Sequence, residues 1–269
     1  MHDLFAIFSY GFMQRALLVG ALVAPCAALL GVSLVLRRYA MIGDGLSHVG
    51  FGALSLAIAL DAAPLAVSLP IVILSAFLLL RLSESSKMCG DSAIALVSSS
   101  AIALGVVITS LSKGMSTDVN DLMFGSILAM TESDVTLSVI LSAAVLLVFI
   151  LFYRKIFSIT FDENFAQTSG VHVKTHTMLL AMLTAITIVL GMRIMGAMLI
   201  SSLIIFPALT AMRVFRSFRS VTIVAALISF VAFLAGLYLS FIFSLPTGAT
   251  IVLVNLMFFL VFSIIGHKR

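Results

Sequence analysis

Long runs of apolar residues follow one another along the chain, with short polar segments between them. A helix of about 20 apolar residues crosses the hydrocarbon core of a bilayer. The pattern predicts an all-α polytopic membrane protein with about eight to nine transmembrane helices. The predicted spans are residues 16–36, 46–60, 64–80, 92–111, 135–152, 177–191, 197–212, 221–243 and 248–265.

Composition supports this interpretation. Hydrophobic residues make up 62% of the chain and charged residues 10%, whereas a soluble domain carries about 25% charged residues. Residues 1–269 are therefore predicted to form a single transmembrane domain. One apolar segment, residues 120–130, is too short to span and is predicted to be a re-entrant or surface helix on the outer side.

Lysine and arginine are distributed unevenly over the two ends of the predicted spans. Because loops rich in these residues stay in the cytoplasm, the distribution places the N-terminus outside and the C-terminus inside. Only Arg15, Lys113 and Arg193 fall on the outer side. The cytoplasmic side receives Arg37, Arg38, Arg81, Lys87, Arg154, Lys155, Lys174, Arg213, Arg216, Arg219, Lys268 and Arg269.

The outer side also collects acidic residues, so that its three bases and six acids give a net charge of −3. An acidic outer end would concentrate cations near the protein. Outer loops that merely lack lysine and arginine would give the same balance, and both interpretations stay open. The outer acids are Asp3, Asp61, Asp118, Asp121, Glu132 and Asp134.

A carboxylate and an imidazole lie four residues apart in the segment GDGLSH, residues 43–48. On a helix, Asp44 and His48 share one face, and aspartate oxygen with histidine nitrogen is a suitable ligand pair for Zn²⁺ or Mn²⁺. Ionisable groups inside a membrane are costly, which favours a functional role. Alternatively, Asp44 caps a helix that begins at Gly45, and His48 forms hydrogen bonds within the bundle.

Two ligands do not complete a metal site. In a homodimer with this helix at the twofold axis, two copies of Asp44 and His48 would supply four ligands, whereas a monomer would need other ligands or water. A second histidine pair, His172 and His176, has the same spacing. Histidines on an interfacial helix are more often ordinary polar residues, and that interpretation is favoured here.

The longest predicted cytoplasmic loop, residues 154–176, contains start and stop signals for a short helix. Thr160 or Asp162 can cap the helix, and Glu163 then lies in its first turn. Gly170 can end it. A short helix held between two spans is a suitable docking element for a partner, and the alternative is an ordinary connecting turn.

Several catalytic motifs are absent from the sequence. It contains neither a Walker A motif for ATP nor an HExxH motif of metalloproteases. Apart from Asp44 and Arg193 near helix ends, the spans carry no charge, which argues against a carrier that relays protons. The chain is therefore predicted to have no enzymatic activity of its own.

Five segments, in this order and spacing, resemble the integral-membrane permeases of bacterial ABC importers for zinc and manganese. The resemblance covers almost the whole chain. The segments are GVSLVLRR at 31–38 with GDGLSH at 43–48, LMFGSIL at 122–128, FDE at 161–163 with Ala166 and GV at 170–171, MGAML at 195–199 with FPA at 206–208, and PTGA at 246–249.

The resemblance implies a homodimeric permease in the bacterial cytoplasmic (inner) membrane, with a separate cytoplasmic ATPase and an extracytoplasmic metal-binding protein. Asp44 and His48 would be ligands of the transported ion, Zn²⁺ or Mn²⁺, with zinc favoured. Asp162, Glu163 and Gly170 would belong to the helix that docks on the ATPase. ATP would be hydrolysed on the ATPase chain, and neither a permanently bound cofactor nor a nucleic acid is implied.

A function of another class competes with this one. A self-sufficient divalent-cation channel or secondary carrier would move metal without any ATPase, and a membrane scaffold would have no transported substrate. A geometric question also stays open. The span predicted at 46–60 puts Asp44 near the cytoplasmic end of its helix, so that either the site is an inner gate or the helix begins earlier.

Overall fold

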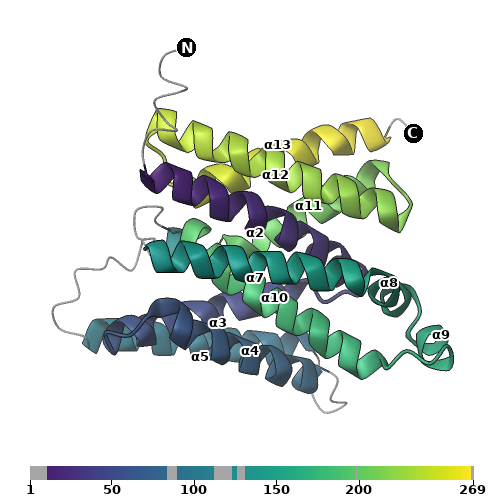
Figure 1. The fold of residues 1–269 in the computed structure, drawn as a ribbon, viewed down its shortest axis with the longest axis horizontal. Helices are drawn as coiled ribbons and strands as arrows, with labels where there is room; N and C mark the ends of the chain where they lie inside the picture. Colours follow the sequence, from purple (N-terminus) through teal and green to yellow (C-terminus); the bar gives the residue numbers. More distant parts are fainter. Residues whose placement is uncertain (1–10, 84–89, 112–122, 126–130, 198, 268–269) are drawn as a thin grey trace.

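The computed structural model describes residues 11–83, 90–111, 123–125, 131–197 and 199–267, and within these ranges the chain forms eleven helices and no strands. The long helices lie side by side, so that their ends gather at two opposite ends of the molecule (Figure 1). The long helices are α2 (Gly11–Leu36), α3 (Ala40–Ala59), α4 (Pro64–Ser83), α5 (Gly90–Leu111), α7 (Glu132–Leu151), α10 (Val173–Met195), α12 (Phe218–Phe243) and α13 (Thr247–His267). Three shorter helices are α8 (Tyr153–Phe161), α9 (Glu163–Thr168) and α11 (Ile200–Val214).

Eight helices in the described ranges are long and apolar enough to cross a membrane, which confirms the predicted all-α polytopic fold. The ninth predicted span, residues 197–212, corresponds to α11. This helix has 15 residues and is about 22 Å long, shorter than a hydrocarbon core of about 30 Å. It packs against α2, α12 and α13, so contacts with neighbouring helices hold it in the bundle.

The start of α3 differs from the prediction and bears on the candidate site. The helix begins at Ala40, six residues before the predicted residue 46. Asp44 and the glycines on either side of it interrupt the apolar run, and the sequence pattern therefore placed the start after them, at residue 46. In the folded chain Ile42 is buried, which shows that tertiary packing covers this first turn.

Burial divides the helices into a central set and a peripheral set. α3 and α10 are buried along most of their length, whereas α5, α7 and α13 expose most of theirs. Large exposed side chains on these peripheral helices are apolar, for example Leu104, Leu147 and Leu253. An apolar outer surface of this kind suits contact with lipid chains, which are as apolar as leucine.

α3 is held in place by close approach to α5. A Cβ atom added at Gly52 would lie 2.8 Å from the carbonyl oxygen of Ala101 in α5. A Cβ atom at Gly105 of α5 would lie 2.7 Å from the ring of Phe51 in α3. Small residues allow helix backbones to approach in membranes, and here they let α5 pack directly against the helix that carries Asp44.

Ion pairs join the helices at the end of the bundle where α2 and α7 begin. Arg193 of α10 binds the carboxylate of Asp134 in α7 at 2.8 Å, and both side chains are nearly buried. Arg15 of α2 binds Glu132 of α7 at 2.9 Å. Two of the six predicted outer acids are therefore neutralised locally. Asp61 is exposed, and the other three, Asp3, Asp118 and Asp121, lie outside the described residues.

The short outer element predicted at 120–130 lies mostly outside the described residues, and only 123–125 can be compared. Gly125 and Gly196 both have positive φ angles, and a Cβ atom on either would lie 2.5 Å from the backbone nitrogen of the other. Only glycine accepts this combination without strain. Two of the segments that carry the family resemblance thus meet at the end of α10.

The approach of α3 to α5 predicts different effects for two glycines of α3. Gly52→Ala places a methyl group against backbone atoms and should destabilise the folded protein by about 1–3 kcal/mol. Gly43→Ala is the matched control, because the nearest atom to its Cβ would be at an ordinary 3.5 Å. Thermal unfolding in detergent measures both, and equal stability of the two variants would contradict the proposed packing.

Candidate functional site

Asp44 and His48 lie on one face of α3 and point toward each other. The Nε2 atom of His48 is 3.4 Å from Oδ2 of Asp44, and the side chains are 16% and 36% exposed, respectively. Two ligands about 2.1 Å from a tetrahedral ion stand about 3.4 Å apart. The two donor atoms therefore have a separation that one metal ion could bridge.

The alternative role of Asp44 as a helix cap is wrong. α3 begins at Ala40 and is preceded by Tyr39, so Asp44 is the fifth residue inside the helix. The Ser47 hydroxyl donates to the backbone carbonyl oxygen of Asp44 at 2.6 Å, so this hydrogen bond does not use the side-chain carboxylate. The Ser201 hydroxyl of α11 lies beside the carboxylate and brings a second helix to the site.

The longer helix also answers the question of depth. α3 has 20 residues and is about 30 Å long, so Asp44 lies about 6 Å and His48 about 12 Å from its first residue. The candidate ligands thus begin one turn inside the helix and reach toward its middle. In the described ranges no group of three or more His, Cys, Asp or Glu residues could hold a metal, so one chain supplies an incomplete ligand set.

The second histidine pair does not form a site. His176 is buried, its ring packs edge-on against Phe152 with centroids 5.6 Å apart, and Nδ1 faces the carbonyl oxygen of His172 at 2.9 Å. His172 is exposed at the start of α10. The interpretation of these histidines as ordinary polar residues agrees with this geometry.

The predicted short helix in the 154–176 loop is present as α9. Asp162 is its N-cap and accepts a hydrogen bond from the backbone N–H of Phe165 at 2.9 Å, and Glu163 lies in the first turn. Gly170, with φ +81°, follows the last turn. Thr160 is not the cap, because its hydroxyl donates to the carbonyl of Ile156 within the preceding helix.

That preceding helix, α8, was missed by the sequence analysis. Its apolar positions Tyr153, Ile156, Phe157 and Phe161 recur every three or four residues, a helical signal that could have revealed it. The rings of Phe157 and Phe161 pack on Phe218 at the start of α12, with centroids 5.2 and 5.8 Å away. These contacts anchor the segment that leads into α9.

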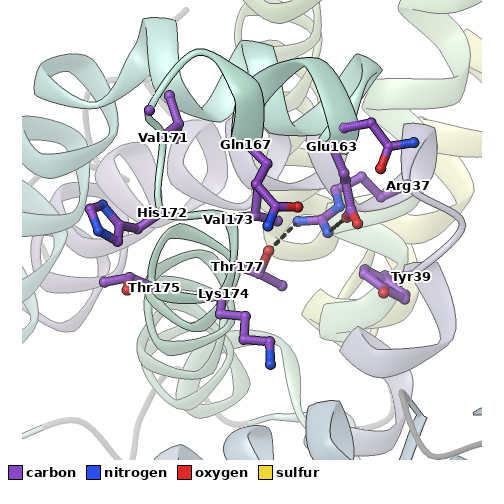
Figure 2. Close-up of a pocket in the computed structure, with 12 residues that line it drawn as sticks. Arg37, Tyr39, Glu163, Gln167, Val171, His172, Val173, Lys174, Thr175 and Thr177 are labelled. Carbon is purple, nitrogen blue, oxygen red and sulfur yellow. Dashed lines mark hydrogen bonds and ion pairs between the residues drawn. The ribbon is translucent and has the colours of Figure 1, made fainter.

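Arg37 connects α9 to the helix of the candidate metal site. It follows the last residue of α2, and its guanidinium forms an ion pair with Glu163 and a 2.9 Å hydrogen bond to Thr177 of α10 (Figure 2). Its side chain is 5% exposed, and α3 begins three residues further on. In the sequence Arg37 marks the topology and belongs to the segment 31–38 of the family resemblance, but its partner Glu163 lies 126 residues away and no local pattern reveals the pair.

A cavity of about 680 Å³ lies beside this ion pair, between the turn that joins α2 to α3 and the segment that joins α9 to α10. Arg37, Tyr39, Gln167 and Lys174 line it, as does the backbone of Gly170 (Figure 2). Among the hydrogen bonds and ion pairs of the described residues, the Glu163–Arg37 pair joins α9 to the turn before α3.

Together these features define a polytopic helical membrane protein with an Asp–His pair inside one long apolar helix and a short capped helix, α9, between α8 and α10. The chain belongs to the ABC 3 transport family, whose family model matches residues 9–266. A solved structure of PsaBC from Streptococcus pneumoniae, in complex with a Fab, has a TM-score of 0.86 and 28% identity. The match covers 96% of this chain and 93% of that one.

Relatives in the family carry the names of different metals. The chain is 30% identical to the manganese transport system membrane protein MntC of Halalkalibacterium halodurans, over 92% of this chain and 85% of the relative. It is 31% identical to the high-affinity zinc uptake system membrane protein ZnuB of Haemophilus influenzae, over 94% of this chain and 97% of the relative.

The cap of α9 gives a test of this local structure. Asp162→Ala removes the acceptor for the N–H of Phe165 and should destabilise α9 by about 0.5–2 kcal/mol. Hydrogen exchange of amides 163–168 should then become faster by a factor of about 2–30. Asp162→Asn is the control, because asparagine caps a helix equally well. Unchanged exchange in the alanine variant would show that contacts other than the cap hold α9.

Proposed function

We propose that this chain is the permease subunit of an ATP-driven ABC importer for a divalent transition metal, Zn²⁺ or Mn²⁺. The observation that carries the proposal is the Asp44–His48 pair, whose donor atoms are 3.4 Å apart on a central membrane helix. The relatives named for manganese and zinc transport support the substrate class. The preference for zinc that the resemblance implies stays a prediction, because the relatives carry both metals' names.

The metal site is proposed to be completed by a second copy of the chain. Two copies with α3 near a twofold axis would bring together two carboxylates and two imidazoles, which is a full ligand set for a tetrahedral ion. The 36% exposure of the Asp44 side chain supports this arrangement, since a carboxylate buried within one chain could not be shared. In this arrangement the ion passes between the two copies of α3.

ATP hydrolysis is proposed to occur on a separate cytoplasmic ATPase, and an extracytoplasmic binding protein delivers the metal. The basic end of the bundle faces the cytoplasm of a bacterial cell, with the N-terminus outside and the C-terminus inside. α9 lies at that end, and Phe165 on it is 65% exposed. An exposed phenylalanine on a capped helix is a suitable anchor for a partner.

The Arg37–Glu163 ion pair is proposed to carry movement of α9 to the metal site. A displacement of α9 by the ATPase acts on Arg37, which lies in the short turn between α2 and α3. α3 holds Asp44 one turn further along. Switching between two arrangements of packed helices is a common way to open a site to alternate sides.

Transport measurements test the ligand assignment. Vesicles that contain this chain, its ATPase and its binding protein should take up radioactive zinc or manganese only with ATP. Asp44→Asn and His48→Gln should each lower uptake by at least about tenfold, because each removes one ligand. Asp61→Asn, at the other end of α3, is the matched control and should transport normally. Normal uptake by Asp44→Asn would refute the ligand role, and ATP-independent uptake by this chain alone would indicate a channel or carrier.

Co-purification tests the docking role of α9. Glu163→Lys breaks the ion pair and places a like charge beside Arg37, and it should weaken binding of the ATPase by roughly tenfold. Glu132→Lys is the matched control, since Glu132 is also an exposed glutamate paired with an arginine but lies at the opposite end of the bundle. If both variants retain the ATPase equally, α9 is not its docking site.

A further inference from the structure

An apolar groove of about 580 Å³ lies between α2, α7 and α12 and involves no residue of the candidate metal site. Pro25 and Leu29 of α2, Phe149 and Ile150 of α7, and the α12 residues from 222 to 230 line it. Its volume falls in the range of about 300–1,000 Å³ that small-molecule sites occupy. Because α2, α7 and α12 are membrane-spanning helices by length and composition, the groove opens toward lipid.

The groove has a polar end, and this end belongs to the basic side of the bundle. Tyr153, the first residue of α8, lines the groove there. Its ring packs on Phe218 of α12 with centroids 5.5 Å apart, which brings the starts of α8 and α12 together. Burial raises the pKa of the Tyr153 phenol, with the nearby Arg219 charge opposing this shift, so the hydroxyl stays a hydrogen-bond donor at neutral pH.

Two exposed arginines flank Tyr153. Arg154 follows it in the first turn of α8, and Arg219 lies in the first turn of α12, close enough to act on the phenol electrostatically. Among the residues that the structure describes, neither arginine forms an ion pair with a carboxylate. Neither arginine lines the groove itself, but Arg154 is next to Tyr153 in the chain and Arg219 acts on its phenol, so the exposed charges beside the polar end of the groove are positive.

We propose that this groove binds an anionic phospholipid, with an acyl chain against α2, α7 and α12 and the headgroup phosphate between Arg154 and Arg219. Guanidinium groups bind phosphate oxygens in paired hydrogen bonds, and basic pockets between spans on the cytoplasmic side select anionic headgroups. A tyrosine hydroxyl at the membrane interface suits the same headgroup. The proposal depends on the orientation given above and not on metal transport.

The charges favour this occupant over a second copy of the chain. A second copy that packed on this groove would have to place acidic residues opposite Arg154 and Arg219. Around the groove, however, α7 and α12 expose leucine and isoleucine. A lipid supplies both the phosphate and a flexible chain that fills an irregular hollow. Bound there, it would connect α7, α8 and α12 beside the segment that leads to α9.

Lipid titrations of the purified full-length chain, followed by native mass spectrometry, test the headgroup. Phosphatidylglycerol should bind more tightly than phosphatidylcholine with the same acyl chains. Arg219→Gln and Arg154→Gln should each weaken binding of phosphatidylglycerol roughly fivefold, as expected for one lost cytoplasmic charge. Arg81→Gln is the matched control, since Arg81 is exposed in the last turn of α4, a helix that contributes no residue to the lining of the groove.

Filling the groove tests where the acyl chain of the lipid lies. Ala226 lines the groove, and Ala226→Phe should weaken binding of both lipids at least fivefold. Ala103→Phe, at an exposed position of α5, is the control for added bulk. Thermal unfolding establishes that each variant is folded, and if Ala226→Phe is not, the arginine variants still decide the question.

Two results would overturn the proposal. Equal binding of the two lipids, unaffected by Arg219→Gln and Arg154→Gln, would mean that the groove does not select an anionic headgroup. Dissociation of a dimer by Ala226→Phe, with lipid binding unchanged, would mean that a second copy covers the groove. Selective loss of phosphatidylglycerol binding in the arginine and groove variants, with both controls unchanged, would support the proposal.

Discussion

A bilayer core offers no water to a polar group, and this constraint explains how the polar residues of the spans are placed. Buried hydroxyls donate back to carbonyl oxygens of their own helix, as Thr184, Thr187 and Thr222 do at 2.7–2.9 Å. The nearly buried Arg193 has Asp134 as its counter-ion. Asp44 and His48 differ, because each keeps an exposed fraction and has a donor atom directed at the other. This exposure and this separation are the reason why the pair is proposed as the metal site.

The position of α3 links this pair to the basic end of the bundle. α2 ends at Leu36 and α3 begins at Ala40, so the turn between them is short, and Arg38 within it has φ +62°, a conformation that side chains rarely adopt. Arg37 leaves this turn and binds both α9 and α10. Through one guanidinium, the short helix α9 is connected to the turn that leads into the helix with the candidate ligands. The proposed coupling depends on this connection and on the close packing of α3 against α5.

Different parts of the bundle serve different proposed partners. In Figure 1, α3, α4 and α5 lie together on one side, α11, α12 and α13 on the other, and α2, α7 and α10 between them. The candidate metal ligands belong to the first group, whereas the apolar groove lies between α2, α7 and α12. An ion path shared with a second copy and a lipid in the groove would therefore use separate surfaces. The loop from α8 to α9 lies at the basic end, near the groove and the Arg37 connection.

The sequence by itself determined the helical class, most of the spans, the four-residue spacing of Asp44 and His48, and the presence of α9 with Asp162 as one of two candidate caps. Each of these depends on local periodicity, on a cap or on spacing within one helix. Tertiary structure decided the rest. The early start of α3 depends on packing around Ile42. The ion pairs Arg37–Glu163 and Arg193–Asp134 join residues that are far apart in the sequence. Contacts with Phe218 anchor α8. A sequence pattern reports which residues share a face of one helix, but only the packing of helices decides which charges meet between them.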